Sequence, residues 1–275
     1  MNEPNHMRRI AIIWFALSVI LTPIVVAVIA PTLPPGDATS AADNQLSDDT
    51  LLLGIVTPIA VAMIVYFAYT MIVFRRRGEP TEEGPATRDN RAVHIPWLVG
   101  TTAIVLFLAT FGTVELADAG AGGGEGPEPA FKMTGDVLPV QVIAQQWEFT
   151  YRYPTYGGVE TAHLELPVDK NVEFHVTSLD VIHSFWAPRL GVKADANPGV
   201  DNVAFVKPWQ EMSFDIRCSE LCGLWHGYMF DTGQVVSESA FEEWIHEQQR
   251  TFAPATKFLP KYSTQYFPEP ERRAG

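Results

Sequence analysis

Four side chains able to bind a soft metal ion lie within twelve residues of the sequence. They are Cys218, Cys222, His226 and Met229. Thiolate, thioether and imidazole groups together suit copper better than hard cations, and zinc has little use for a thioether. A mononuclear blue copper site takes one Cys, whereas two thiolates are enough to bridge two copper ions. The spacing therefore predicts a dinuclear copper site, whose chemistry is electron transfer.

Such a site needs a second imidazole, and the sequence has seven His. We favour His183, which lies between an apolar run and a turn ending at Pro188, where a loop can carry it to the cysteines. The remaining His lie at the terminus, at the end of an apolar segment or in polar surroundings: His6, His94, His163, His175 and His246.

Each of these residues also has an ordinary interpretation. Two cysteines in an exported domain usually form a disulfide. Met229 alone is more often a core residue, and a lone His183 is more often simply hydrogen-bonded. A disulfide does not explain His226 and Met229 at these spacings, so the combination favours copper.

The residues around these ligands alternate between apolar and polar, which predicts strands. Met212, Phe214, Ile216 and Cys218 share one face of such a run. Further runs lie at Val137–Tyr153, Val172–Thr177 and Val203–Val206. Strands at this spacing indicate an all-β sandwich or barrel. One helix should close the domain, with Ser239 and Glu242 as its capping box.

Three apolar stretches precede this domain, at Ile10–Ala30, Leu51–Phe74 and Ile95–Leu116. Each has about the 20 residues that a helix needs to cross a bilayer. The loop 75–94 contains five Arg and should be cytoplasmic, whereas the loop 31–50 has four Asp and no Lys or Arg. We therefore expect a multi-pass protein of the bacterial cell membrane with an extracytoplasmic C-terminal domain.

The first apolar stretch also fits a signal peptide, with a possible cleavage site after Ala42. The predicted organisation is an N-terminal segment 1–42 (signal peptide or extra membrane helix), a transmembrane helix hairpin 43–117, a Gly-rich linker 118–130, a β domain 131–250 and a tail 251–275. This is a membrane-anchored all-β protein.

The net charge is −13. Residues 118–275 hold 12 Lys+Arg and 22 Asp+Glu, so 12 − 22 = −10 of it lies in the C-terminal part. An acidic surface argues against nucleic acid and for a basic partner. The negative net charge could also serve only to keep the protein soluble.

The chain resembles subunit II of cytochrome c oxidase, in the haem–copper oxidase superfamily. The run Cys218–Met229 matches the ligand positions of that family's dinuclear copper (CuA) loop. The segment from His183 to Gly199 matches the part bearing the first histidine, and Gln146-Trp147 matches the start of the aromatic motif. The membrane hairpin also matches, and the resemblance covers roughly residues 46–250.

The resemblance implies a cupredoxin-like β-barrel in which side chains bind two copper ions. The ligands would be His183, Cys218, Cys222, His226 and Met229. Glu220 would give its backbone carbonyl to copper and its carboxylate to Mg²⁺ at the interface with subunit I. Trp147 would receive the electron from cytochrome c. Subunit I would hold the haem and reduce oxygen to water with proton translocation. Subunit III and membrane lipid would be further partners.

Some positions depart from the family pattern. His94 stands where a Glu commonly marks the mouth of a proton path, and an imidazole could relay protons there. The acidic residues that the family often has after the aromatic motif are missing from this sequence. Asp180, Glu148 and Glu160 are the remaining residues expected to dock a basic cytochrome, although a solvated surface would explain them as well.

Other functions fit less well. Quinol oxidases have lost the copper ligands, all of which are present here. A fused cytochrome c would need a Cys-x-x-Cys-His motif, which the sequence lacks. Nitrous oxide reductase carries a similar loop but is a longer, soluble enzyme. A copper-delivery or redox-sensing membrane protein would bind one copper or none and would readily form a Cys218–Cys222 disulfide.

Overall fold

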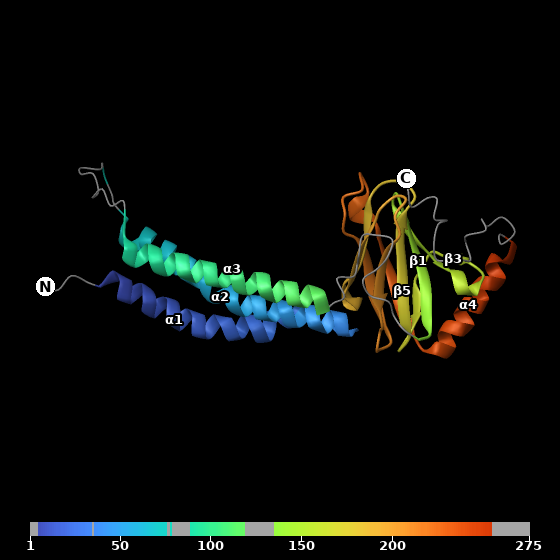
Figure 1. Ribbon diagram of the computed structural model, residues 1–275, viewed down its shortest axis with the longest axis horizontal. Helices are drawn as coiled ribbons and strands as arrows, with labels where there is room; N and C mark the ends of the chain where they lie inside the picture. The colour runs from blue at the N-terminus through green and yellow to red at the C-terminus, as the bar shows by residue number, and fades with distance from the viewer. Residues whose placement is uncertain (1–4, 35, 76–77, 79–88, 119–134, 255–275) are drawn as a thin grey trace. The chain divides into compact units, whose positions relative to one another are not determined.

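The computed structural model describes residues 5–34, 36–75, 78, 89–118 and 135–254 (Figure 1). The chain forms two compact units, one of Met1–Val28 with Leu52–Gly120 and one of Ile29–Leu51 with Ala121–Gly275. Most of the predicted cytoplasmic loop 75–94, nearly all of the linker 118–130 and most of the tail 251–275 lie outside the described residues.

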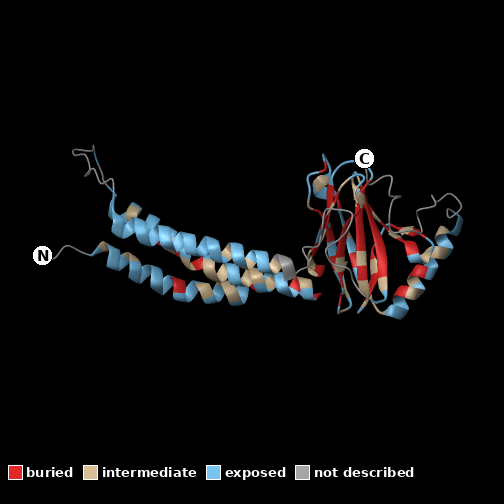
Figure 2. Cartoon of the chain, in the orientation of Figure 1, coloured by how far each residue is buried: buried red, intermediate tan, exposed pale blue. Residues whose placement is uncertain are grey.

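The first unit is helical. Its elements are α1 (His6–Ile24), a π-helical turn η1 (Val25–Ile29), the apolar part of α2 (Ser40–Val73) and α3 (Arg91–Asp118). Among the described residues, three helices are long and apolar enough to cross a membrane, and most of their side chains are exposed (Figure 2). The indole nitrogen of Trp14 donates a 2.8 Å hydrogen bond to the carbonyl of Pro58, so the first helix contacts the second.

The described residues of the second unit form two five-stranded sheets, and its fold is cupredoxin-like, as predicted. One sheet has the order β3-β2-β1-β5-β8 and the other β4-β10-β9-β6-β7. The strands of the first sheet are β1 (Val137–Gln145), β2 (Glu148–Tyr153), β3 (Val159–Thr161), β5 (Asn171–Ser178) and β8 (Asn202–Val206). Those of the second are β4 (Glu165–Pro167), β6 (His183–Ala187), β7 (Val192–Ala196), β9 (Met212–Cys218) and β10 (Phe230–Val236).

The predicted alternation holds in β9, where Phe214, Ile216 and Cys218 are buried and the residues between them are exposed. The long apolar run at Val137–Tyr153 is not one strand. It forms the antiparallel pair β1 and β2, separated by a turn at Gln146-Trp147. Inward-facing side chains from both sheets form one apolar core (Figure 2).

The closing helix is α4 (Glu238–Phe252). The predicted capping box of Ser239 and Glu242 is wrong, because the helix begins two residues earlier. The hydroxyl of Ser237 accepts from the amide of Ala240 and caps the helix instead. The buried face of α4 carries Phe241 and Ile245.

A segment that precedes the membrane hairpin belongs to the β unit, and we call residues 36–45 the clasp. The Thr39 hydroxyl donates to the Leu190 carbonyl at 2.8 Å and accepts from the Ala42 amide at 3.0 Å. Thr39 and Ala42 are buried. A methyl group added at Gly191 would come within 2.6 Å of the Ala42 nitrogen, so the two backbones are in direct contact.

Candidate metal centre

The predicted ligands come from two neighbouring strands and the loop that follows one of them. His183 begins β6 and Cys218 ends β9, and the two strands pair with Phe185 opposite Cys218. The loop after β9 carries Glu220 and Cys222, the 3₁₀ turn η5 (His226–Tyr228) and Met229. A hydrogen bond from the Cys218 amide to the Met229 carbonyl, 3.0 Å long, closes this loop.

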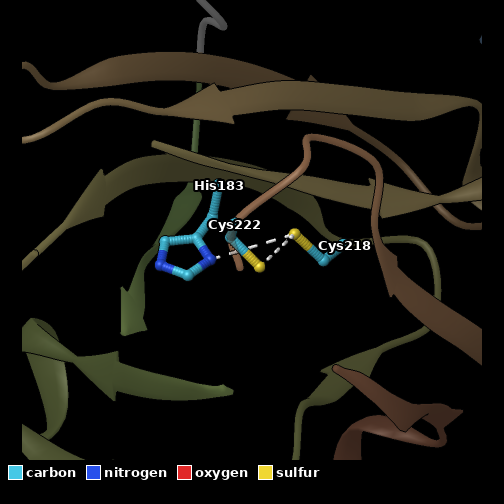
Figure 3. A group of neighbouring side chains, drawn as sticks. All are labelled: His183, Cys218 and Cys222. Carbon is cyan, nitrogen blue, oxygen red and sulfur yellow. Dashed lines mark hydrogen bonds between the residues drawn. The ribbon is translucent and has the colours of Figure 1, made fainter. Parts of the chain in front are cut away.

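The six predicted donor atoms gather at one place. The two cysteine sulfurs are 3.8 Å apart. His183 Nδ1 lies 3.9 Å from Cys218 Sγ, and His226 Nδ1 lies 3.6 Å from Cys222 Sγ. Met229 Sδ is 3.8 Å from Cys222 Sγ, and the Glu220 carbonyl oxygen is 3.2 Å from Cys218 Sγ. Figure 3 shows the His183 ring turned toward the two sulfurs.

These separations fit donors that share a metal ion. Metal–sulfur and metal–nitrogen bonds of about 2.0 to 2.3 Å at tetrahedral angles place two donors roughly 3.3 to 3.8 Å apart. The ring nitrogen of His183 and the two cysteine sulfurs all lie within 4.8 Å of one another. The donor set of soft sulfur and imidazole nitrogen matches copper.

The cysteines are free thiols. Their sulfurs are far beyond the roughly 2.05 Å of a disulfide bond. Burial, and after it the neighbouring Cys218, raises the pKa of Cys222 to about 12. A metal ion binding here must therefore displace protons, so binding would release them to solvent.

Asp180 orients the His183 ring from the side opposite the sulfurs. Its Oδ1 lies 2.9 Å from His183 Nε2, and its Oδ2 accepts from the Gln146 amide at 2.7 Å. Oδ1 also accepts from the Val181 amide. Burial alone would raise the pKa of Asp180, but these hydrogen bonds outweigh it and lower the pKa. The carboxylate thus stays ionised and leaves Nδ1 of His183 free to face Cys218.

Trp147 lies in the β1–β2 turn and contacts the cysteine loop. Its indole Nε1 and the Gln146 side-chain amide both donate to the Cys222 carbonyl, at 3.3 and 2.8 Å. The contact with Gly223 is close, because a methyl group there would lie 3.0 Å from the Gln146 amide nitrogen. Trp147 was predicted from the sequence, whereas the role of Gln146 was not, because its only signal is its position beside the tryptophan.

The other predicted residues have polar partners of their own. Glu148 accepts from the Gln145 amide, and Glu160 pairs with Arg152 at 2.7 Å. His94 is exposed in α3 and lies 3.2 Å from Asp89.

The sequence predicts polar surroundings for His175. It is nevertheless only 2% exposed and lies between Asp201 and Glu173, 3.0 Å from each. No local pattern in the sequence predicts this buried cluster.

Comparison with known proteins gives a consistent result. The family model "Cytochrome C oxidase subunit II, periplasmic domain" matches residues 160–236. Cytochrome c oxidase subunit 2 of Bacillus subtilis (strain 168) is 31% identical over 250 residues, covering 86% of this chain and 68% of the relative. The protein of the same name from Thermostichus vulcanus is 31% identical over 196 residues, covering 68% of this chain and 58% of the relative.

The cytochrome c oxidase subunit 2 of Alkalihalophilus pseudofirmus is 25% identical, and the chain spans 64% of its length. Among solved structures, the periplasmic domain of subunit II of cytochrome oxidase from Bradyrhizobium japonicum has 31% identity and a TM-score of 0.42. That similarity covers 44% of this chain and 99% of the solved domain.

Proposed function

Since the chain belongs to the cytochrome c oxidase subunit II family, we propose that it is the electron-accepting subunit of a haem–copper oxidase. It takes electrons from cytochrome c and passes them to haem in subunit I, where oxygen is reduced to water with proton translocation. The observation that carries this proposal is the gathering of two free thiols, two imidazoles and a thioether around one point.

The sulfurs of Cys218 and Cys222 would hold two copper ions. His183 and His226 would each bind through Nδ1, Met229 would be a weak ligand and the Glu220 carbonyl would complete the set. Copper bound there would supply a one-electron relay. The chain supplies rigidity, because Asp180 fixes one imidazole and the Cys218–Met229 hydrogen bond fixes the loop.

Trp147 is proposed as the point of electron entry. Its ring is half-buried and its N–H points to the carbonyl of Cys222, a residue whose sulfur lies at the metal centre. The indole is thus connected to a copper ligand by one hydrogen bond and a few covalent bonds. This hydrogen bond would make a short path from the domain surface to the metal centre.

The remaining roles follow the family. The exposed carboxylate of Glu220 would bind Mg²⁺ at the boundary with subunit I, and subunit III would complete the complex. Asp180, Glu148 and Glu160 would attract a basic cytochrome c, and His94 would relay protons at the cytoplasmic end of α3. The apolar helices anchor the chain in the membrane and leave the copper domain on the extracytoplasmic side.

The copper assignment can be tested on the full-length protein in detergent. We expect two copper ions per chain after reconstitution and a seven-line hyperfine pattern in the EPR spectrum of the mixed-valence state. A four-line pattern, or one copper per chain, would refute a dinuclear centre and favour a copper-delivery protein.

The electron-entry assignment can be tested with Trp147→Phe. Phenylalanine keeps an aromatic ring but removes the N–H that bonds to Cys222. We expect an unchanged copper EPR spectrum and slower reduction of the centre by cytochrome c in stopped-flow experiments. Phe149→Leu, a change at a buried ring of the adjacent strand, controls for general loss of packing. Unchanged reduction in the tryptophan variant would count against this entry point.

A further inference from the structure

The outer part of the metal loop, around Cys222, lies beyond the end of strand β9. The loop starts at the sheet, where the Ser219 amide donates to the Ser184 carbonyl of β6 at 3.1 Å. It returns to the sheet at Met229, whose carbonyl accepts from the Cys218 amide at 3.0 Å. Between these two points, the position of the Cys222 backbone depends on contacts outside the second sheet.

Gln146, in the turn between β1 and β2, supplies such a contact with its side chain. Its amide nitrogen Nε2 donates to the Cys222 carbonyl at 2.8 Å, and the Trp147 indole donates to the same oxygen at 3.3 Å. Gly223 makes room for this amide. Its φ of +116° lies in the region that favours glycine, and a methyl group there would be 3.0 Å from Gln146 Nε2. The shorter of the two bonds to the Cys222 carbonyl is therefore made by the glutamine.

The main chain of Gln146 contacts the segment that carries the other kind of ligand. Its backbone amide donates to Asp180 Oδ2 at 2.7 Å, and Oδ1 of the same carboxylate lies 2.9 Å from Nε2 of the His183 ring. Figure 3 shows this ring beside the two cysteine sulfurs. The two contacts of Gln146 are separated only by the covalent bonds of one residue. A shift of either ligand segment relative to the other would therefore stretch one of its hydrogen bonds.

The neighbouring glutamine has different surroundings. Gln145 is the last residue of β1, and its side-chain amide donates to Glu148 Oε1 at 2.6 Å within the same turn. Its hydrogen bond thus closes the turn itself, whereas Gln146 reaches two other segments of the chain. The same substitution made at both positions separates these two roles.

We propose that Gln146 is a positioning residue that fixes Cys222 relative to His183 before a metal ion binds. The proposal rests on the proposed function for the identity of the centre, and it adds a residue that assembles the centre. One consequence concerns the two cysteine sulfurs, which lie 3.8 Å apart and would have to approach to roughly 2.05 Å to form a disulfide. Because the thiolate is the form that binds metal, a loop that keeps the sulfurs apart preserves the site for copper.

The test uses metal-free, full-length protein in detergent and compares Gln146→Met with the matched control Gln145→Met. Methionine has a side chain of similar length but no N–H to donate. Diamide, a diazene oxidant, takes two electrons and two protons from the two thiols as the S–S bond forms. The chain has two cysteines, so the loss of free thiols with time reports this one reaction. We expect Gln146→Met to be oxidised about fivefold faster than the unaltered protein, the size expected for one lost hydrogen bond, and Gln145→Met to be unchanged.

A double variant tests whether Gln146 joins the two segments. Asp180→Asn weakens the contact of its backbone amide, and Gln146→Met removes the contact of its side chain. If one residue bridges the segments, the second change should add less once the first has been made. We therefore expect the double variant to be oxidised more slowly than the product of the two single effects predicts. Gln146 is an exposed residue, so its replacement removes little packing, and Gln146→Leu repeats the test with a side chain of another shape.

The copper-loaded proteins give a spectroscopic measure of the same role. We expect changed hyperfine splitting in the EPR spectrum of Gln146→Met, because Cys222 would be displaced from the metal, and an unchanged spectrum for Gln145→Met. Equal oxidation rates of the two methionine variants, identical spectra, or single effects that simply multiply would each overturn the inference. One copper per chain in the unaltered protein would instead refute the proposed function, whereas the thiol rates are measured without metal and judge Gln146 independently.

Discussion

Replacing Asp180 with Asn separates two roles for this carboxylate. As a docking residue, it would matter only for cytochrome c. As a positioning residue, it would matter for the copper ligand His183, whose ring it holds at 2.9 Å. Asn keeps the size of the side chain but has one acceptor oxygen in place of two.

The expected size of the effect follows from the contacts. In the unaltered protein the Gln146 backbone amide donates to Asp180 Oδ2 at 2.7 Å. If the Asn oxygen keeps the contacts with His183 and Val181, the Asn NH₂ group faces this amide, and two donors cannot bond to each other. One hydrogen bond to a charged group is lost, which is worth about 1.5–3 kcal/mol, and partial exposure favours the lower part of that range. The lost bond loosens the His183 ring, and removing such a partner of a metal-binding His typically weakens metal binding about 10- to 100-fold.

The assay is copper competition with a chelator on the full-length protein, followed by EPR and steady-state kinetics in the complex. Glu160→Gln is the control, because it removes the same charge but its carboxylate pairs with Arg152, away from the ligands. We expect only Asp180→Asn to lose copper more readily. Copper retention equal to the control, with a raised KM for cytochrome c alone, would refute the positioning role.

Three further predictions concern the metal loop, the clasp and the buried histidine. Met229→Leu should retain copper but shift its reduction potential, since the thioether is a weak ligand, and redox titration followed by EPR would show this. Thr39→Ala should destabilise the β unit by about 1–3 kcal/mol through the lost cap and hydrogen bond, whereas Thr39→Ser should not, as thermal melts would reveal. Burial lowers the pKa of His175, but Asp201 and Glu173 outweigh it and raise the pKa above its usual value. The stability from this pairing is present below about pH 6.5 and is lost as pH rises through the folded pKa, so His175→Gln should flatten the fall of the melting temperature at alkaline pH.

Local patterns made the metal loop predictable. Cys218, Cys222, His226 and Met229 lie in one short stretch, so spacing alone indicated a shared site, and strand alternation correctly put Cys218 on the buried face. The partners of the ligands were not predictable in the same way. Asp180 lies 34 residues from Gln146. Which backbone amide donates a hydrogen bond to its carboxylate depends on how two loops meet in space.

The apolar runs predicted the helices because membrane helices depend on length and hydrophobicity, which a sequence displays directly. The position of His175 shows the limit of alternation. The alternation of apolar and polar residues predicts on which face of a strand a side chain lies. It does not predict whether other residues bury that face. The clasp was missed for the same reason, because its contacts with Leu190 join residues 151 positions apart.

If the segment 1–42 is a signal peptide, the clasp limits when it can be removed. A signal peptidase acting after Ala42 would have to cut inside the first turn of α2, at a residue that is completely buried against the β unit. Such a cut can occur only before Thr39 engages Leu190. Processing and folding would thus compete in time, and a chain whose copper domain has already closed on the clasp keeps its first helix.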